Sequence, residues 1–243
     1  MSAPRPLEAQ TAKPRPEPVA VLELFTSEGC SSCPAADAFL RELSTEARDG
    51  GQRLFALAFH VDIWDRLGWP DRFARAEYTD RQRFFFIVMG MYVIYTPQLI
   101  VNGTRHLVGS NRTRARSAIA DALTRPMEVH VALDVESVTR GREVLARAIC
   151  DPPAVPAVLH VAVVERGLSS QVKRGENTGR LLLHPDVVRG LVTVDAKGGA
   201  SAVAVPIPED LELSASSLVA WVQERETGAI LGADAQDLSE PSR

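Results

Sequence analysis

The sequence contains few cysteines and no long apolar run, and each shortage excludes a class of protein. Only three cysteines occur among 243 residues, too few for a secreted scaffold held together by several disulfides. No apolar run reaches the roughly 20 residues that a membrane-spanning helix needs. The net charge of −4 gives no reason to expect a nucleic-acid partner. Hydrophobic residues make up 45% of the chain, so a substantial core can form.

The two ends of the chain lack the features of folded or targeting segments. Residues 1–18 are rich in proline, alanine and charge and have no apolar signal core, so we expect a disordered N-terminal tail. The protein is predicted to be cytoplasmic as the chain is written, or periplasmic or secreted if a signal has been removed. Residues 234–243 are polar and are predicted to form a loose C-terminal tail.

A C-x-x-C motif, formed by Cys30 and Cys33, lies where a strand is predicted to end and a helix to begin. The β-forming run 19–25 precedes it, and apolar residues at helical spacing follow it from Ala36. A helix N-terminus carries unpaired N–H groups and partial positive charge, which favour the thiolate form of a cysteine. We therefore expect Cys30 to be the attacking thiol and Cys33 the resolving one. Pro34 suits the first helical turn because its missing N–H is not needed there.

Other uses of this cysteine pair remain open. The two thiols can also form a buried structural disulfide, or bind a soft metal ion such as Cu(I). A zinc site needs further ligands, and the only other cysteine, Cys150, lies far along the chain. Cys150 is interpreted as a small core residue. We predict no resident metal and no cofactor.

A second chemically rich segment follows the apolar run 54–61, which is predicted to be a buried central strand. His60, Asp62, Trp64 and Trp69 lie within ten residues of one another. Loops after the strands of an α/β sheet lie at the edge where ligands bind, so these four residues are predicted to contact substrate near Cys30. Alternatively, the tryptophans pack under the loop and His60 is a hydrogen-bonded core residue. Glu23 competes as a base for the resolving thiol if its side chain is buried behind the pair.

The segment 95–103 is predicted to form a strand that begins at Pro97 and ends at the turn Asn102-Gly103. Residues 105–108 form the partner strand, and a helix follows over 112–123. The predicted order over residues 19–123 is therefore β-α-β-α-β-β-α.

This order, with C-x-x-C at the first strand–helix junction and Thr96-Pro97 opening the third strand, resembles the thioredoxin fold. Further segments resemble an uncharacterised bacterial family, domain of unknown function 1223: 23–34, 60–65, 67–69, 81–82, 95–98, 174–180 and 184–189. The resemblance implies a thioredoxin-like domain, often in an exported protein, and supplies no substrate. It also implies that Pro97 is cis and lies against the cysteine pair, which makes Pro97 a candidate catalytic residue and Thr96 a candidate substrate-binding one.

From residue 129 onward, short β-like segments alternate with turns, a spacing typical of an antiparallel β-sandwich. We therefore predict a thioredoxin-like α/β domain over residues 19–126, followed by a β-sandwich domain over residues 127–233. Glu176, Asn177 and Arg180 form a polar cluster in the second part. Its first interpretation is a solvated turn. The alternative is that it reaches the N-terminal part and walls the cleft.

The function predicted from these patterns is thiol–disulfide oxidoreductase activity on a protein or small-molecule thiol. Cys30 would attack, a mixed disulfide would form, and Cys33 would resolve it. Two alternatives are a non-catalytic binding module with a structural disulfide, and a Cu(I)-handling protein. The sequence does not indicate the substrate, the redox direction or the oligomeric state.

Overall fold

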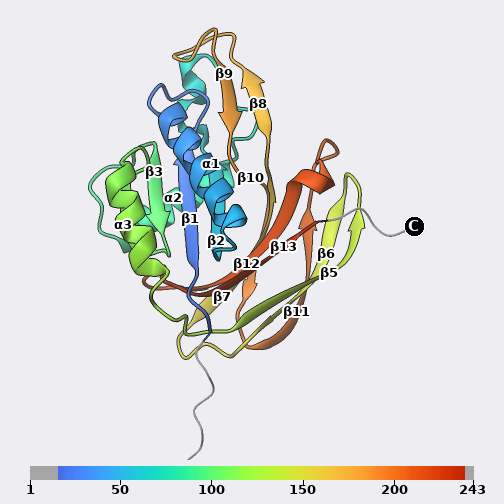
Figure 1. Cartoon of the computed structure of the whole chain (residues 1–243). Coiled ribbons are helices and arrows are strands. Elements are labelled where there is room, and N and C mark those ends of the chain that lie inside the picture. Colours follow the sequence, from blue (N-terminus) through green and yellow to red (C-terminus); the bar gives the residue numbers. More distant parts are fainter. Residues whose placement is uncertain (1–15, 239–243) are drawn as a thin grey trace, which may run out of the picture.

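The computed structural model describes residues 16–238, and Figure 1 shows the arrangement of their helices and strands. The first half contains β1 (Ala20–Thr26), α1 (Cys33–Asp49), β2 (Leu54–His60), η1 (Asp62–Leu67), α2 (Ala76–Val88), β3 (Gln98–Val101), β4 (Arg105–Val108) and α3 (Arg112–Ala122). The second half contains β5 (Val131–Thr139), β6 (Glu143–Cys150), β7 (Ala157–Glu165), β8 (Leu168–Gln171), β9 (Leu181–His184), β10 (Val187–Asp195), β11 (Gly199–Pro206), η2 (Leu213–Ala215), β12 (Ser216–Glu224) and β13 (Ile230–Asp237).

One eight-stranded mixed sheet unites the two halves of the sequence. Its strand order is β13-β12-β7-β10-β2-β1-β3-β4. The junction is between β10 and β2, where Val187 pairs with Ala58 in parallel and the Ala58 N–H donates to the Asp186 carbonyl over 2.8 Å. Two small sheets, β11-β6-β5 and β8-β9, complete the described strands.

The predicted thioredoxin-like domain followed by an antiparallel β-sandwich is therefore wrong. The second half does contain short strands, but β7, β10, β12 and β13 extend the sheet of the first half instead of forming a sandwich of their own. One edge of β2 pairs with β1, and the backbone N–H and C=O groups on its other edge also need hydrogen-bond partners. The strand β10 supplies such partners. Whether 19–126 and 127–233 fold as separate units stays a prediction.

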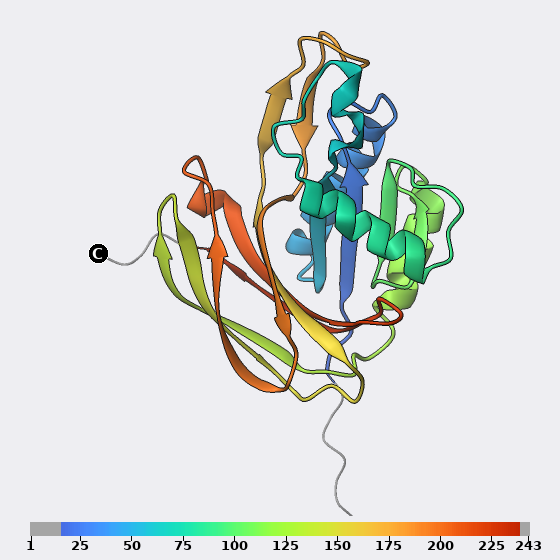
Figure 2. The same ribbon diagram turned by 180° about the vertical axis from the view of Figure 1, so that it is seen from behind.

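Three apolar clusters explain this arrangement. Alternate residues of β1 face opposite sides: Leu22 and Leu24 pack with α1 and α3, whereas Val21 and Phe25 pack with α2 and with strands of the second half. Figure 2 shows α2 on the face opposite to α1. A third cluster lies between β7, β12 and the three-stranded sheet. The α2-side cluster is thus shared by both halves of the chain.

Two further predictions concern the chain ends. Residues 1–15, which include most of the predicted N-terminal tail, lie outside the described residues, as do residues 239–243 of the predicted C-terminal tail. Within the described part, β13 extends to Asp237. No helix among the residues 16–238 is long and apolar enough to cross a membrane.

Candidate functional site around the Cys30–Cys33 pair

Cys30 and Cys33 form a disulfide at the junction of β1 and α1, with Cα atoms 5.4 Å apart. Cys33 is the first residue of α1, and Pro34 occupies the first turn, as predicted. Cys30 lies just before the helix and is 4% exposed, whereas Cys33 is fully buried. Cys30 is thus the outer of the two cysteines, and the roles of Cys30 as attacking thiol and of Cys33 as resolving thiol stay predictions.

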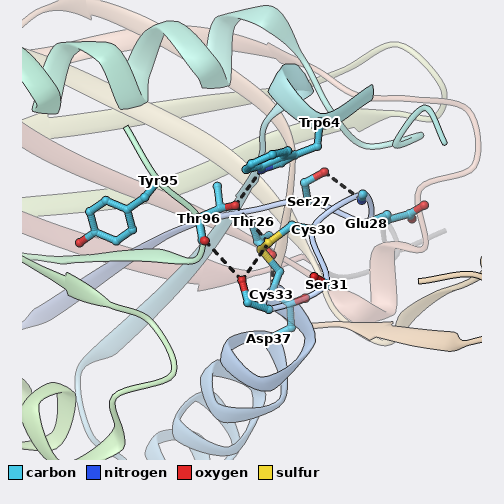
Figure 3. Close-up of a disulfide and its surroundings, with 12 residues drawn as sticks. Thr26, Ser27, Glu28, Cys30, Ser31, Cys33, Asp37, Trp64, Tyr95 and Thr96 are labelled. Atoms are coloured by element: carbon cyan, nitrogen blue, oxygen red, sulfur yellow. Dashed lines mark hydrogen bonds between the residues drawn. A yellow bond between two sulfur atoms is a disulfide. The ribbon is translucent and has the colours of Figure 1, made fainter. Parts of the chain in front are cut away.

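Two side chains from other segments reach the Cys30 sulfur in series (Figure 3). The Thr96 hydroxyl donates to Cys30 Sγ over 3.1 Å, and Trp64 Nε1 donates to the Thr96 hydroxyl over 2.8 Å. The Thr96–Pro97 bond is cis, as the resemblance implied. A hydroxyl that accepts one hydrogen bond donates the next one more strongly. The Trp64–Thr96 series is therefore suited to stabilising negative charge on Cys30.

A loop of the second half, residues 172–180, lies against the cysteine segment. The Asn177 amide is fully buried and donates to the carbonyl oxygens of Glu28 and Cys30 over 2.8 and 3.0 Å. The Glu176 carboxylate accepts from the Ser31 N–H over 3.0 Å. Gly175 has φ +78°, and a Cβ there would lie 3.2 Å from Trp69 Cβ, so the close approach of this loop favours glycine. The polar cluster at residues 176–180 thus reaches the N-terminal part, which was the alternative interpretation.

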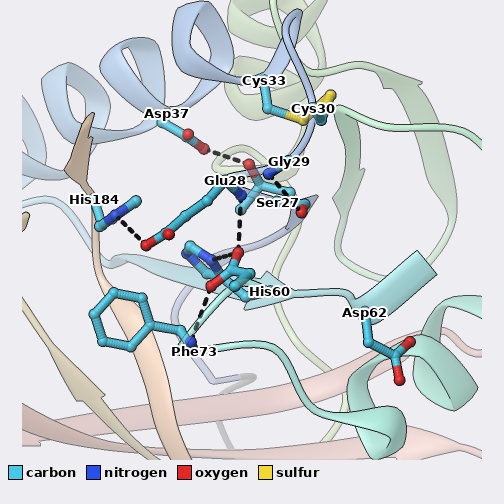
Figure 4. Close-up of polar contacts among 12 residues, drawn as sticks. Ser27, Glu28, Gly29, Cys30, Cys33, Asp37, His60, Asp62, Phe73 and His184 are labelled. Atoms are coloured by element: carbon cyan, nitrogen blue, oxygen red, sulfur yellow. Dashed lines mark hydrogen bonds and ion pairs between the residues drawn. A yellow bond between two sulfur atoms is a disulfide. The ribbon is translucent and has the colours of Figure 1, made fainter. Parts of the chain in front are cut away.

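Five ionisable side chains are buried beneath the cysteine segment, and we call them the Cys-loop cluster: Glu28, Asp37, His60, Asp71 and His184. Figure 4 shows Glu28 in the loop after β1, Asp37 on α1, His60 at the end of β2 and His184 at the end of β9 converging beneath the cysteines. Asp71 lies in the segment between η1 and α2.

The Asp71 carboxylate is the best-satisfied member of the Cys-loop cluster. It accepts from the Glu28 and Phe73 N–H groups over 2.8 and 2.9 Å and lies 2.7 Å from His60 Nδ1. His184 Nε2 lies 3.1 Å from a Glu28 carboxylate oxygen, and Trp69 Nε1 donates to the other over 2.6 Å. The His60–Asp71 and His184–Glu28 pairs hold the cysteine segment from below.

Asp37 differs from these pairs because it has no cationic partner in direct contact among the described residues. It is buried in α1, one helical turn after Cys33, and accepts a 2.7 Å hydrogen bond from the Thr26 hydroxyl. Residues four apart on a helix share one face, so Asp37 lies behind Cys33. Burial raises the pKa of the Asp37 carboxyl to about 6, against the attraction of His60 and the Thr26 hydrogen bond. Asp37 can therefore gain or lose a proton near neutral pH.

Burial and pairing act in opposite directions on the other members. Burial tends to lower the pKa of His60, but the Asp71 carboxylate outweighs it and the net shift is upward. Burial tends to raise the pKa of Asp71, but His60 and two backbone N–H groups bring it below its usual value. The pKa of Glu28 is likewise lowered, because hydrogen bonds led by that from His184 overcome the effect of burial. The opposite shifts favour the charged forms of His60 and Asp71, whereas the pKa of the Asp37 carboxyl is raised.

Three buried imidazole nitrogens of the Cys-loop cluster have no hydrogen-bond partner in the described part of the chain: His60 Nε2, His184 Nδ1 and His184 Nε2, the last of which only lies 3.1 Å from the Glu28 carboxylate. Buried polar atoms are usually satisfied, and exceptions often mark functional sites. No group of three or more His, Cys, Asp and Glu side chains between residues 16 and 238 is arranged to hold a metal ion.

The remaining residues named in the sequence analysis lie at different distances from the Cys30–Cys33 disulfide. Trp69 reaches Glu28 and not the sulfur. His60 lies in the cluster below the cysteines and is 1% exposed. Asp62 accepts from the Thr79 hydroxyl over 2.6 Å and points away from the disulfide (Figure 4). Cys150 is buried at the end of β6. The predicted contact with substrate is untested for Trp69, His60 and Asp62.

Glu23 does not lie behind the cysteines. It faces α2, where both of its oxygens accept hydrogen bonds from Arg81. Arg81 Nη2 also donates to Gln223 Oε1 over 3.1 Å, and His160 contacts both Gln223 and Thr193. We call these five residues the Arg81 cluster. It accounts for Glu23 structurally and removes it as a candidate base.

Asp37, Asp71, Glu28, His184 and Asn177 were not among the predicted site residues. Asp37 had a detectable signal, because a carboxylate falls on the apolar face of α1 among Ala36, Leu40 and Leu43. Asn177 was considered only as part of the polar cluster at residues 176–180, and the contacts of Asn177 and His184 with the cysteine segment depend on how the second half folds back onto β1.

The comparisons with known proteins agree with this architecture. Residues 21–223 match the family described as "Protein of unknown function (DUF1223)". The solved structure of protein AGR_C_4864 from Agrobacterium tumefaciens is 30% identical, with a TM-score of 0.67 over 93% of this chain and 98% of that chain. HBP35 of Porphyromonas gingivalis is 18% identical, with a TM-score of 0.63 over 93% of this chain and 77% of that chain, and shares the fold. The comparison with curated proteins gave no match. The chain therefore belongs to the family of proteins of unknown function DUF1223.

Proposed function

We propose that this protein is a thiol–disulfide oxidoreductase that acts on a protein or small-molecule thiol through Cys30 and Cys33. The observation that supports this most strongly is the pair's surroundings: a series of hydrogen-bond donors ends at Cys30 Sγ, and a carboxyl with a raised pKa lies one turn behind Cys33. A structural disulfide needs neither feature.

In the reductive direction, the Cys30 thiolate attacks one sulfur of a substrate disulfide. A Cys30–substrate disulfide forms and the other substrate sulfur leaves as a thiolate. The Asp37 carboxylate accepts the Cys33 proton, and the Cys33 thiolate attacks Cys30 Sγ. The Cys30–Cys33 disulfide forms and the second substrate thiolate leaves. Two electrons pass from the protein to the substrate, and the two departing thiolates take up protons. Oxidation of a substrate dithiol is the reverse sequence.

Trapping of the mixed disulfide tests this proposal. Replacing Cys33 with Ser removes the resolving thiol, so Cys30 should retain a disulfide to a model substrate such as oxidised glutathione, detected by mass. Cys33→Ser/Cys30→Ser is the matched control and should retain none. In the reduced wild-type protein, Cys30 should react with iodoacetamide faster than Cys33 and Cys150 below neutral pH. Equal labelling of all three thiols at every pH would contradict the proposal.

One observation favours a structural disulfide as the second candidate: both cysteines are buried, with Cys30 only 4% exposed. In that case the protein is a binding module and the pair resists strong reductant. Stoichiometric Cu(I) uptake by the reduced protein that is lost in Cys33→Ser would instead indicate metal handling by the two thiolates.

A further inference from the structure

The Glu176 carboxylate contacts the backbone of the cysteine segment just before the N-cap of α1. Its oxygen accepts the N–H of Ser31, the residue that directly follows Cys30 in the bend leading into α1. Glu176 is exposed and comes from the 172–180 loop, 145 residues further along the chain. Asn177 fixes this loop through the Glu28 and Cys30 carbonyls, so the position of the carboxylate is set by the fold.

This placement acts against ionisation of Cys30. The N–H groups before and within the first turn of a helix favour a nearby anion. Glu176 accepts the N–H of Ser31, which directly precedes the N-cap Ser32, and places a negative charge beside this end of the helix. Hydrogen bonds from the Ser31 side chain and N–H lower the pKa of Glu176, so the carboxylate is charged at neutral pH.

The neighbouring charges do not cancel this effect. Glu28 is already paired with His184, and Arg180 donates to the Asn177 side chain over 2.8 Å. Asp37 and Asp65 are further carboxyls on this side of the molecule, and burial raises the pKa of both. Within residues 16–238, no lysine or arginine is recorded in an ion pair with Glu176. The side chain that favours the thiolate is Thr96, whose hydroxyl donates to Cys30 Sγ over 3.1 Å. The Ser32 hydroxyl lies 3.3 Å from the sulfur and donates to the Thr96 carbonyl.

We propose that Glu176 is a positioning residue that suppresses ionisation of Cys30 and thereby shifts the pair toward the disulfide. This inference rests on the proposed redox function and adds the direction of electron transfer that the protein favours. Because the charge disfavours the Cys30 thiolate, it raises the free energy of the reduced pair relative to the disulfide. The reduced protein is then a stronger reductant than the same pair would be without Glu176, and the second half of the chain sets this property of the first.

The test compares Glu176→Gln and Glu176→Lys with wild type. Glutamine keeps an oxygen that can accept the Ser31 N–H and removes only the charge. We expect the ionisation constant of Cys30, from the pH dependence of its alkylation rate, to rise about threefold in Glu176→Gln and about tenfold in Glu176→Lys. Where the thiolate is the main reduced species, a tenfold change raises the two-electron midpoint potential by about 30 mV. Both shifts should shrink at 1 M salt, because the carboxylate is exposed.

Glu226→Gln is the matched control, since it removes the same charge from an exposed position between β12 and β13, and it should leave both measurements at the wild-type values. If the variants of Glu176 also match wild type while the pair titrates reversibly, the inference about Glu176 is overturned and the proposed function stands. If the wild-type pair cannot be reduced reversibly at all, the proposed function fails and the inference fails with it.

Discussion

The Cys-loop cluster and the Arg81 cluster are both ionic, both built from the two halves of the chain and, apart from the exposed Thr193, both buried. The hydrogen-bonding groups of the two clusters are nevertheless satisfied to different degrees. In the Arg81 cluster, Glu23 is held by two hydrogen bonds from Arg81, and burial and Arg81 lower the pKa of His160 well below its usual value. In the Cys-loop cluster, imidazole nitrogens lack partners within the described residues and Asp37 has a pKa of about 6.

Under the proposed function, this difference separates a structural network from one that takes part in proton transfer. A buried polar network in which each charge has its partner fixes one arrangement of the chain. A carboxyl that is buried without a cationic contact destabilises the fold at neutral pH, and such groups concentrate at functional sites. The Arg81 cluster joins α2 to β12, whereas the Cys-loop cluster supports a disulfide and can supply a proton to it.

The largest expected effect comes from separating the halves. A fragment ending at Arg125 keeps the apolar cluster between β1, α1 and α3 but loses the residues of β7, β10 and β12 from the α2-side cluster. We expect it to keep helical circular dichroism and to lose at least about half of a free energy of unfolding on the order of 10 kcal/mol. An unfolded fragment would show that residues 19–126 are not a separate unit.

Arg81→Met should have the next largest effect. It leaves the Glu23 carboxylate buried without a cation, which should lower the free energy of unfolding by about 3–5 kcal/mol in urea titrations. The double variant Glu23→Gln/Arg81→Met removes both charges and should recover most of this loss. The cysteine midpoint potential should be unchanged in both. A shifted potential would mean that the two clusters are coupled.

Asp37→Asn should affect stability in the opposite direction. Because the folded-state pKa is raised from 3.8 to about 6, the folded protein binds this proton more tightly than the unfolded chain does. Stability therefore falls as pH rises from about 4 to 6, by ~3 kcal/mol at order of magnitude. Asparagine can still accept from Thr26 but carries no charge. Asp37→Asn should thus be more stable than wild type by about that amount at pH 8 and equal to it near pH 3.5.

The Asp37→Asn variant should also resolve the mixed disulfide more slowly, although it should be more stable than wild type at pH 8. Without the carboxylate, resolution by Cys33 should slow by roughly 10²-fold, measured as the lifetime of the mixed disulfide in stopped-flow experiments. Asp71→Asn is the matched control: it removes the partner of His60 and should lower stability at pH 8. A less stable Asp37→Asn at pH 8 would contradict the role assigned to Asp37.

Thr96→Val and Trp64→Phe should have the smallest effects on the protein, both on the ionisation of Cys30. Thr96→Val removes the donor to Cys30 Sγ and leaves Trp64 Nε1 without its acceptor. The ionisation constant of Cys30 should fall about tenfold, a change opposite in sign to that of Glu176→Gln. Trp64→Phe should give a shift of the same sign but smaller, because Trp64 acts through Thr96. If neither variant changes the pH dependence of Cys30 alkylation, the Trp64–Thr96 series does not influence the ionisation of Cys30.

The sequence predicted local features well and long-range pairing poorly. The strand 54–61, the hairpin at Asn102-Gly103 and the helix after Asn111 depend on neighbouring residues, and the structure contains each of them. The predicted sandwich was wrong because alternating strands do not reveal their partners, and the pairing of β10 with β2 spans more than 120 residues. For the same reason the cysteine pair was predictable, whereas the contacts of Asn177 and His184 with its loop were not.

A redox titration of the Cys30–Cys33 pair in the full-length protein tests the central claim most directly. The protein would be equilibrated in dithiothreitol buffers of graded ratio, and its free thiols would be mass-tagged and counted. The account predicts one reversible two-electron transition, with two tags added together and Cys150 unchanged through the transition. A disulfide that survives excess dithiothreitol while the protein remains folded would contradict it and would make the pair structural.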